Sequence, residues 1–279
     1  MNTKEWEAFL LGATEEVRRR LSPLASRGGR GRTVGVGAAG DRTIYADRLA
    51  EDTLLDELRK VGGVKVLSEE AGDAGEAEGG TLAVVDPLDG SSNFERGIPF
   101  FCTSVAVVEA GTLDSVTVGV VRDLVTGDVY SARRGGGARK NGRAIRTSKA
   151  AEVAEAVVGV DLSRGPPGLA EGLAPLLGRV KRQVHLGANA LEMCYLAEGK
   201  TDAFVDLRGT MRITDFAAAY LIAAEAGAVV TDGLGGKLSP EFDLAHRFSF
   251  VASANPAVHR EILRLCRGWV SAVETRPKT

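Results

Sequence analysis

The chain has 279 residues and a formal net charge of −2, from 35 basic and 37 acidic residues, so neither nucleic acid nor an anionic membrane is expected as its main partner. Its three cysteines, Cys102, Cys194 and Cys266, are far apart, which argues against a disulfide scaffold or a structural zinc site and is typical of a reducing cytoplasm. We see no apolar leader region and no run of about 18 apolar residues, so neither export nor a membrane span is expected.

Helical periodicity opens the chain. Apolar residues recur at helical spacing over residues 4–21, and we expect Pro23 to end this helix. The basic, glycine-rich segment 27–32 then indicates a solvated linker, with contact to RNA as the alternative. A second helix is predicted over residues 45–60.

The rest of the chain divides into two patterns. Two strands are predicted first, at residues 64–67 and 82–85. Three more follow at 103–108, 115–121 and 128–132, separated by glycine-containing turns that are typical of an antiparallel meander. Alternation follows, with strands at 156–161, 180–186, 203–207, 229–231 and 248–252 and helices at 169–177, 190–199, 215–227 and 257–267. We therefore expect an α+β half (1–150) and an α/β half (151–279) that form one compact catalytic unit.

The segment Asp86–Ser92 (DPLDGSS) carries the strongest chemical signal. It ends an apolar strand with two carboxylates, Asp86 and Asp89, three positions apart on a turn, where they can share a hard cation such as Mg²⁺. The following Gly90, Ser91 and Ser92 supply amide groups that hold phosphate if a helix begins there. This segment predicts metal and phosphate at one site.

Two more acidic segments are candidates for the same site. Glu69 and Glu70 follow the strand at 64–67, where open sheets place ligands, and Asp215 begins a helix of small residues. Each has an ordinary explanation by itself, because glutamate pairs usually face solvent and Asp at a helix start is usually a cap. Only the set of three is informative.

In their order and spacing these motifs resemble the inositol monophosphatase superfamily of Mg²⁺-dependent phosphatases. The matching segments are SEE (68–70), DPLDGS (86–91), TDFAA (214–218) and EAG (225–227). The segments GDRT (40–43) and DLR (206–208) are most similar to the archaeal branch, whose enzymes accept both inositol monophosphate and fructose 1,6-bisphosphate. The resemblance spans nearly the whole chain.

The resemblance implies an α/β (α+β) fold, the layered α-β-α-β-α sandwich of the sugar phosphatases, with the site between the two halves. It implies hydrolysis of a sugar or polyol phosphate monoester by metal-activated water, without a covalent phosphoenzyme. It also implies two or three Mg²⁺ ions, with Mn²⁺ as the alternative metal, a small-molecule phosphate ester as partner, and a homodimer; the cysteine usage predicts that it is cytoplasmic.

The resemblance also assigns metal ligands and catalytic groups. Glu69, Asp86 and the carbonyl of Leu88 would hold one metal, while Asp86, Asp89 and Asp215 would hold a second. Two such ions stabilise the attacking and the departing oxygen of a phosphoryl displacement. Ser91 and Glu69 would orient the water and deprotonate it.

Substrate-binding residues follow from the same comparison. Asp89 and the amides of Gly90, Ser91 and Ser92 would bind the phosphorylated group. Asn189 and Arg208 would contact the rest of the substrate; for Arg208, a surface salt bridge with Asp206 is the alternative.

Asp41 and Asp47 correspond to acids near a third, weaker metal site on a loop that moves over the active site. Asp47 has a second explanation of equal weight, because an acidic residue at this place often caps the start of a helix.

Three other interpretations compete with this one. The segment 35–40 fits G-x-G-x-x-G, but it lacks the buried strand before it and the helix after it that a dinucleotide site needs. A 3′-phosphoadenosine-type nucleotide phosphatase of the same superfamily is the nearest alternative, weakened by the lack of an evident aromatic stacking pair. A non-catalytic regulator that binds RNA or protein through residues 27–32 is the alternative of another class.

Overall fold

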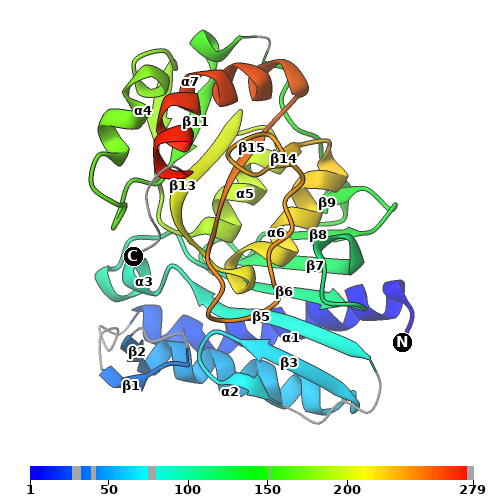
Figure 1. The fold of residues 1–279 in the computed structure, drawn as a ribbon. Helices are drawn as coiled ribbons and strands as arrows, with labels where there is room; N and C mark the ends of the chain where they lie inside the picture. The colour runs from blue at the N-terminus through cyan, green and yellow to red at the C-terminus, as the bar shows by residue number, and fades with distance from the viewer. Residues whose placement is uncertain (27–32, 39–41, 75–79, 151, 275–279) are drawn as a thin grey trace.

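The two larger of three β-sheets in the described residues alternate with three layers of helices, as the computed structural model in Figure 1 shows. The structure describes residues 1–26, 33–38, 42–74, 80–150 and 152–274. Segment 27–32 and Asp41, both singled out above, lie outside the described residues. The layered α-β-α-β-α sandwich expected from the sequence is confirmed in the described part of the chain.

The larger sheet belongs to the first half of the chain. Its strands lie in the order β10-β9-β8-β7-β6-β5-β3-β4 and are mostly antiparallel, with β3 and β5 as a parallel pair. Their bounds are β3 Val64–Ser68, β4 Gly72–Ala74, β5 Thr81–Asp89, β6 Cys102–Val108, β7 Val116–Asp123, β8 Val129–Arg133, β9 Ala138–Lys140 and β10 Arg143–Ala144. Helices α1 (Thr3–Ser26) and α2 (Tyr45–Arg59) cover its outer face.

The smaller sheet belongs to the second half, in the order β12-β11-β13-β15-β14. Its strands are β11 Val157–Val160, β12 Arg182–Val184, β13 Ala203–Met211, β14 Val229–Thr231 and β15 Phe248–Ser253. Both β12 and β13 run parallel to β11, whereas β15 is antiparallel to its two neighbours.

Helices fill the space between the sheets and cover the outer face of the smaller one. Helices α5 (Asn189–Ala197) and α6 (Ile213–Ala226) form the middle layer, which shares one apolar core with the inner faces of both sheets. Helices α4 (Leu169–Leu177) and α7 (Pro256–Glu274) cover the far side through a separate apolar cluster that includes Trp269. Small side chains such as Ala217 and Ala218 let α6 approach closely, and a Cβ on Gly119 of β7 would lie 2.6 Å from the Ala218 carbonyl oxygen.

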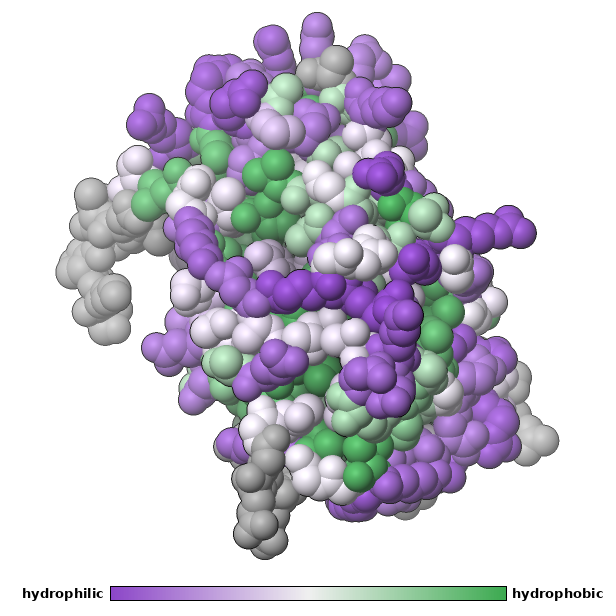
Figure 2. Space-filling model, turned by 90° about the vertical axis from the view of Figure 1, so that its right-hand side faces the viewer, coloured by the Kyte–Doolittle hydropathy of each residue, from purple (hydrophilic) through white to green (hydrophobic). Residues whose placement is uncertain are grey.

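Some hydrophobic side chains reach the surface. On the face drawn in Figure 2 they occur in groups separated by hydrophilic side chains. Among the described residues, no helix combines the length and the apolar character needed to cross a bilayer.

Several boundaries differ from those expected. Pro23 does not end α1, which continues to Ser26; the proline costs one backbone hydrogen bond, and Leu24 after it still packs against the apolar core on the outer side of the large sheet. The exposed strand β1 (Thr33–Val36) pairs with β2 (Arg42–Ile44) in a hairpin that the sequence did not predict. Its antiparallel partner and its exposure are incompatible with the first strand of a dinucleotide fold.

Candidate active site

A cleft of about 540 Å³ lies where the carboxyl ends of parallel strands from both sheets meet. In the larger sheet Glu69 directly follows β3, and Asp86 lies in the last part of its parallel neighbour β5. In the smaller sheet the segments after β11 and β12 and the later part of β13 line the opposite wall. Open sheets bind ligands at such ends because the loops there diverge and leave room.

A bulge in β5 explains how two acids three positions apart share one cleft. The pairing with β6 shifts between Asp86, opposite Ser104, and Asp89, opposite Cys102, so β5 contains one extra residue here. In a regular strand these two side chains would point to opposite faces, whereas the bulge turns both toward the cleft. Pro87 suits this place because it has no N–H group, and its carbonyl oxygen accepts a hydrogen bond of 2.8 Å from Thr103 Oγ1.

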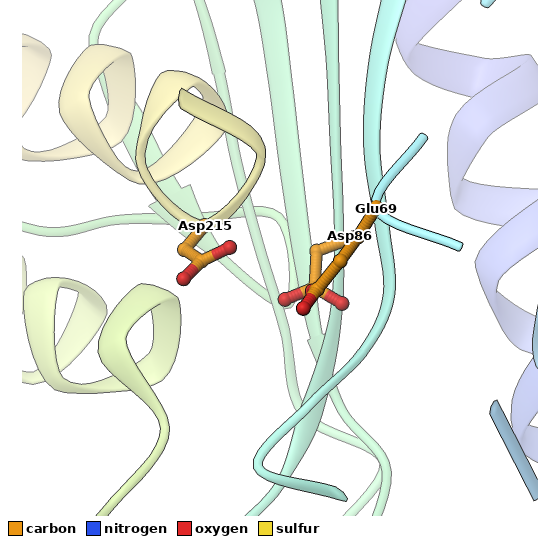
Figure 3. A group of neighbouring side chains, drawn as sticks. All are labelled: Glu69, Asp86 and Asp215. Carbon is orange, nitrogen blue, oxygen red and sulfur yellow. The ribbon is translucent and has the colours of Figure 1, made fainter. Parts of the chain in front are cut away.

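Three carboxylates converge in the cleft, as Figure 3 shows: Asp215 reaches from the start of α6 toward Asp86 and Glu69. One oxygen from each lies within 4.8 Å of the others. Asp86 is buried, while Glu69 and Asp215 are partly buried. Asp215 follows Asp86 by 129 positions and Glu69 by 146 positions in the sequence, and the packing of α6 against the large sheet brings the three together.

Burial and mutual repulsion make these carboxylates unusual. Burial raises the pKa of Asp86 well above its usual range, and the charges of Glu69 and Asp215 raise it further. Burial likewise raises the pKa of Glu69 and of Asp215. A set of desolvated carboxylates that oppose one another's ionisation is a good ligand set for a hard divalent cation, which removes the repulsion and prefers oxygen ligands.

Asp89 lies beside this group and joins the two halves of the molecule. Its Oδ2 accepts a hydrogen bond of 2.7 Å from the amide of Ala190 in the first turn of α5. Burial and the charge of Asp215 raise its pKa to about 8, although the amides of Asn189 and Ala190 oppose the shift. The side chain of Asn189 in turn hydrogen-bonds to Asp215. The expected ligands Asp89 and Leu88 both line the cleft.

The turn after β5 lines the cleft with the start of a short helix. Gly90 caps the short helix α3 (Ser91–Arg96) with φ 89°, and an added Cβ would lie 3.0 Å from the carbonyl oxygen of Phe100, so only glycine fits. Gly90, Ser91 and Ser92 all line the cleft, and the first amides of a helix have no partner within it. Asn93 holds this turn against the other half by donating a hydrogen bond of 2.7 Å to the carbonyl oxygen of Leu186.

Arg208 lines the opposite wall, within a network that extends beyond the ion pair with Asp206 considered from the sequence. Its Nε and Nη2 bind Asp206 at 2.9 and 2.6 Å, which is the ion pair weighed as the alternative, and its Nη1 binds Asp161 at 2.5 Å. His185 lies next to Asp161, at 3.4 Å from its carboxylate, and hydrogen-bonds at 3.0 Å to Glu192. Burial lowers the pKa of His185, but the hydrogen bond and charge of Glu192, together with the charge of Asp161, leave the pKa raised.

The remaining predicted residues concern the hairpin β1–β2. Asp41 is outside the described residues. The carboxylate of Asp47 accepts a hydrogen bond of 2.7 Å from the Ile44 amide, so it caps α2, while Ile44 itself lines the cleft. The hairpin is fixed to the cleft by Glu70, whose carboxylate pairs with Thr43 and whose carbonyl oxygen accepts a bond of 2.9 Å from the Ala38 amide. A third metal site at Asp41 and Asp47 stays a prediction.

Arg212 is a further cleft residue that the sequence did not reveal. It stands directly before α6, and its guanidinium pairs with the carboxylate of Glu69 across the cleft. A cation three positions before Asp215 was visible in the sequence, but its partner lies 143 positions away.

Glu51 of α2 holds the turn that contains Glu69 through hydrogen bonds to the residues on either side of it. This buried carboxylate accepts hydrogen bonds of 2.7 Å from Ser68 Oγ and from the Ala71 amide. Burial raises its pKa above the usual value of 4.5, although these two bonds oppose the shift.

A Glu51→Gln variant should therefore gain stability relative to the wild type as the pH rises. A raised folded-state pKa means that the stabilising contribution of Glu51 is complete below about pH 4.5 and is lost as the pH rises through the raised value. Glutamine keeps both acceptor bonds and does not ionise, so we expect its melting temperature to exceed that of the wild type by about 2 °C or more at pH 8, with the gap closing toward pH 4.5. Thermal melts across this pH range test it, and a gap that does not change with pH would contradict it.

Comparison with known proteins places this site in a family. The family model "Inositol monophosphatase family" matches residues 6–269. A fructose-1,6-bisphosphatase/inositol-1-monophosphatase of Methanothermobacter thermautotrophicus is 37% identical over 93% of this chain and 95% of its own length. The chain therefore belongs to the inositol monophosphatase family and is a phosphoric monoester hydrolase.

A solved structure and a second kind of relative add to this picture. The crystal structure of an inositol monophosphatase–fructose 1,6-bisphosphatase matches with a TM-score of 0.83 and 30% identity, covering 94% of this chain and 99% of that one. A bifunctional NADP phosphatase/NAD kinase of Methanococcus maripaludis is 30% identical over 91% of this chain, which spans only 48% of that protein.

Proposed function

We propose that this phosphatase hydrolyses sugar or polyol phosphate monoesters, inositol 1-phosphate and fructose 1,6-bisphosphate among them, with Mg²⁺ as its cofactor. The convergence of Glu69, Asp86 and Asp215 within 4.8 Å carries the proposal. Carboxylates alone would repel a phosphate monoester, which is itself an anion, so a phosphatase cleft built from them requires a bound cation.

We propose for these residues the roles that the family resemblance implies, and their places in the cleft support this proposal. Bound Mg²⁺ would stabilise charge on the phosphoryl oxygens and lower the pKa of a water molecule. Glu69, Asp86 and Asp215, with Asp89 and the Leu88 carbonyl, would hold the metal. Ser91 Oγ and a carboxylate oxygen of Glu69 would orient the attacking water and accept its proton.

Substrate binding would use both walls. The amides of Gly90, Ser91 and Ser92 would bind the phosphoryl oxygens. The opposite wall offers Asn189, the guanidinium groups of Arg208 and Arg164, and His185, whose raised pKa favours its charged form. Cationic donors there suit a substrate with a second anionic or hydroxyl-rich end, such as a sugar bisphosphate.

A substrate panel tests the proposal. We expect phosphate release with Mg²⁺ from inositol 1-phosphate or fructose 1,6-bisphosphate at rates well above those for nucleotide substrates. If the protein hydrolyses neither of these two compounds, the proposal is wrong.

Arg208→Lys should weaken substrate binding selectively. Lysine keeps the charge but loses the planar donor set that binds Asp206 and Asp161, so we expect the KM for fructose 1,6-bisphosphate to rise at least about fivefold with a smaller change in kcat. Arg96→Lys, at the exposed end of α3, is the control. An unchanged KM would show that Arg208 serves only its ion pairs.

NADP dephosphorylation is the second candidate, favoured by the relatives named NADP phosphatase/NAD kinase. It belongs to the nucleotide phosphatase class weighed from the sequence. Against it, none of the described residues that line the cleft is Phe, Tyr or Trp, the side chains on which a base would stack. NADP⁺ and 3′-phosphoadenosine phosphates belong in the panel, and faster release from either would favour this candidate.

The cytoplasmic location and the homodimeric state are also part of the proposal. All three cysteines are buried free thiols, which suits a reducing compartment. We also propose that residues 1–150 and 151–279 act as one catalytic unit, because the cleft takes side chains from both.

A further inference from the structure

Arg212 places a cation of the chain itself where a metal would be expected to bind. It is the residue before α6, with an extended backbone (φ −102°, ψ 153°), and its Nη1 pairs with Glu69 Oε1 from the other half of the molecule. Both side chains are only 17% exposed, so water screens the pair weakly. The guanidinium also acts through space on Asp215, so it faces two of the three converging carboxylates.

The pair balances charge in the protein without metal. Glu69, Asp86, Asp89 and Asp215 repel one another, and Arg212 neutralises part of this repulsion through a charge-assisted hydrogen bond to Glu69. The same carboxylate is a proposed metal ligand. A divalent cation that binds Glu69 must therefore break or weaken the bond from Arg212.

We propose that Arg212 is an internal counter-cation that holds the Glu69 carboxylate in the metal-free enzyme and gives it up when a divalent cation binds. This inference rests on the proposed metal dependence of the site. Arg212 then sets the metal affinity below what the carboxylates alone would give and keeps the metal-free cleft from being destabilised by its own charge.

The contrary role for Arg212 makes the opposite prediction. If Arg212 instead orients Glu69 for the metal, as supporting residues around metal sites do, its loss would weaken metal binding. The sign of the change in affinity therefore separates the two roles.

Isothermal titration of the metal-free protein with MgCl₂, without substrate, measures this sign. We expect Arg212→Gln to bind Mg²⁺ at least about fivefold more tightly than the wild type, because one positive charge near the metal is removed. Arg212→Lys, which keeps a charge but not the planar fork, should lie between the two. The metal-free Arg212→Gln protein should melt at a lower temperature than the wild type and should gain more from saturating Mg²⁺.

Arg247→Gln is the matched control. Arg247 also acts on Asp215 through space, but its guanidinium donates to the backbone carbonyls of Leu244 and His246. Its loss should change Mg²⁺ affinity less than the loss of Arg212 does. In a Glu69→Gln background, Arg212→Gln should lose most of its effect, since the carboxylate for which it competes is gone.

The outcomes are distinct. If Arg212→Gln binds Mg²⁺ no more tightly than the wild type, the counter-cation role is overturned and the proposed function stays intact. The same holds if Arg247→Gln gains as much Mg²⁺ affinity as Arg212→Gln. If the wild type binds no divalent cation at all, the proposed function fails and this inference with it. Should Arg212→Gln not fold, the affinity of Arg212→Lys decides, and a value equal to or weaker than that of the wild type overturns the inference.

Discussion

Asp86→Asn and Asp215→Asn are each expected to reduce phosphate release at least about 10³-fold while the protein stays folded, because each removes a charge from the carboxylate cluster that is proposed to bind the metal. Phosphate release from inositol 1-phosphate and fructose 1,6-bisphosphate, together with thermal melts of each variant, is the measurement.

The Asp86→Asn substitution should lower activity without lowering the melting temperature of the metal-free protein. Burial and like charges raise the pKa of this carboxyl, so its ionised form is costly in the metal-free protein and a neutral amide relieves the repulsion. We expect the metal-free Asp86→Asn protein to melt no lower than the wild type. The control is Asp56→Asn on the exposed side of α2, which should leave turnover unchanged. An Asp86→Asn enzyme that keeps more than about a tenth of its activity would remove the basis of the proposed mechanism.

Chelation is expected to abolish turnover, and added Mg²⁺ to restore it. The bound ion should also stabilise the fold by mass action: at about 100 times the dissociation constant the gain is about 2.7 kcal/mol, or about 5–10 °C in melting temperature for a chain of this size. The same titration of Asp86→Asn should give little shift, because the shared ligand is absent. Full turnover in excess chelator would falsify the metal requirement, and comparison with MnCl₂ would show which ion serves better.

These two predictions use residues that the sequence already indicated, and the reason is local. Asp86, Asp89 and Gly90 lie within one turn, and the residue types of that turn report its chemistry directly. Glu69 and Asp215 became informative through their order along the chain. The helices and strands were also mostly predictable, because helices such as α2 and α4 have apolar residues at helical spacing, and the structure buries these residues.

Other features had no local signal. The hairpin β1–β2 is short and its strand β1 is exposed, so no buried alternation marks it. The continuation of α1 past Pro23 depends on the packing of Leu24 below the large sheet. His185 and Asp161 had no distinguishing pattern in the sequence. They meet because each follows one of the parallel strands β11 and β12, whose carboxyl ends lie side by side.

The sequence by itself determined the family and the layered fold through the order of its motifs, and it indicated the proposed chemistry: carboxylates for a hard cation and a glycine turn for phosphate. Only the tertiary structure decided how these charges are balanced. It pairs Glu69 with Arg212, joins Asp89 to the start of α5, and links Arg208 to Asp161. The physical reason is that electrostatic energy depends on distances of a few ångströms through a poorly screened interior, and packing sets those distances between residues far apart in the chain.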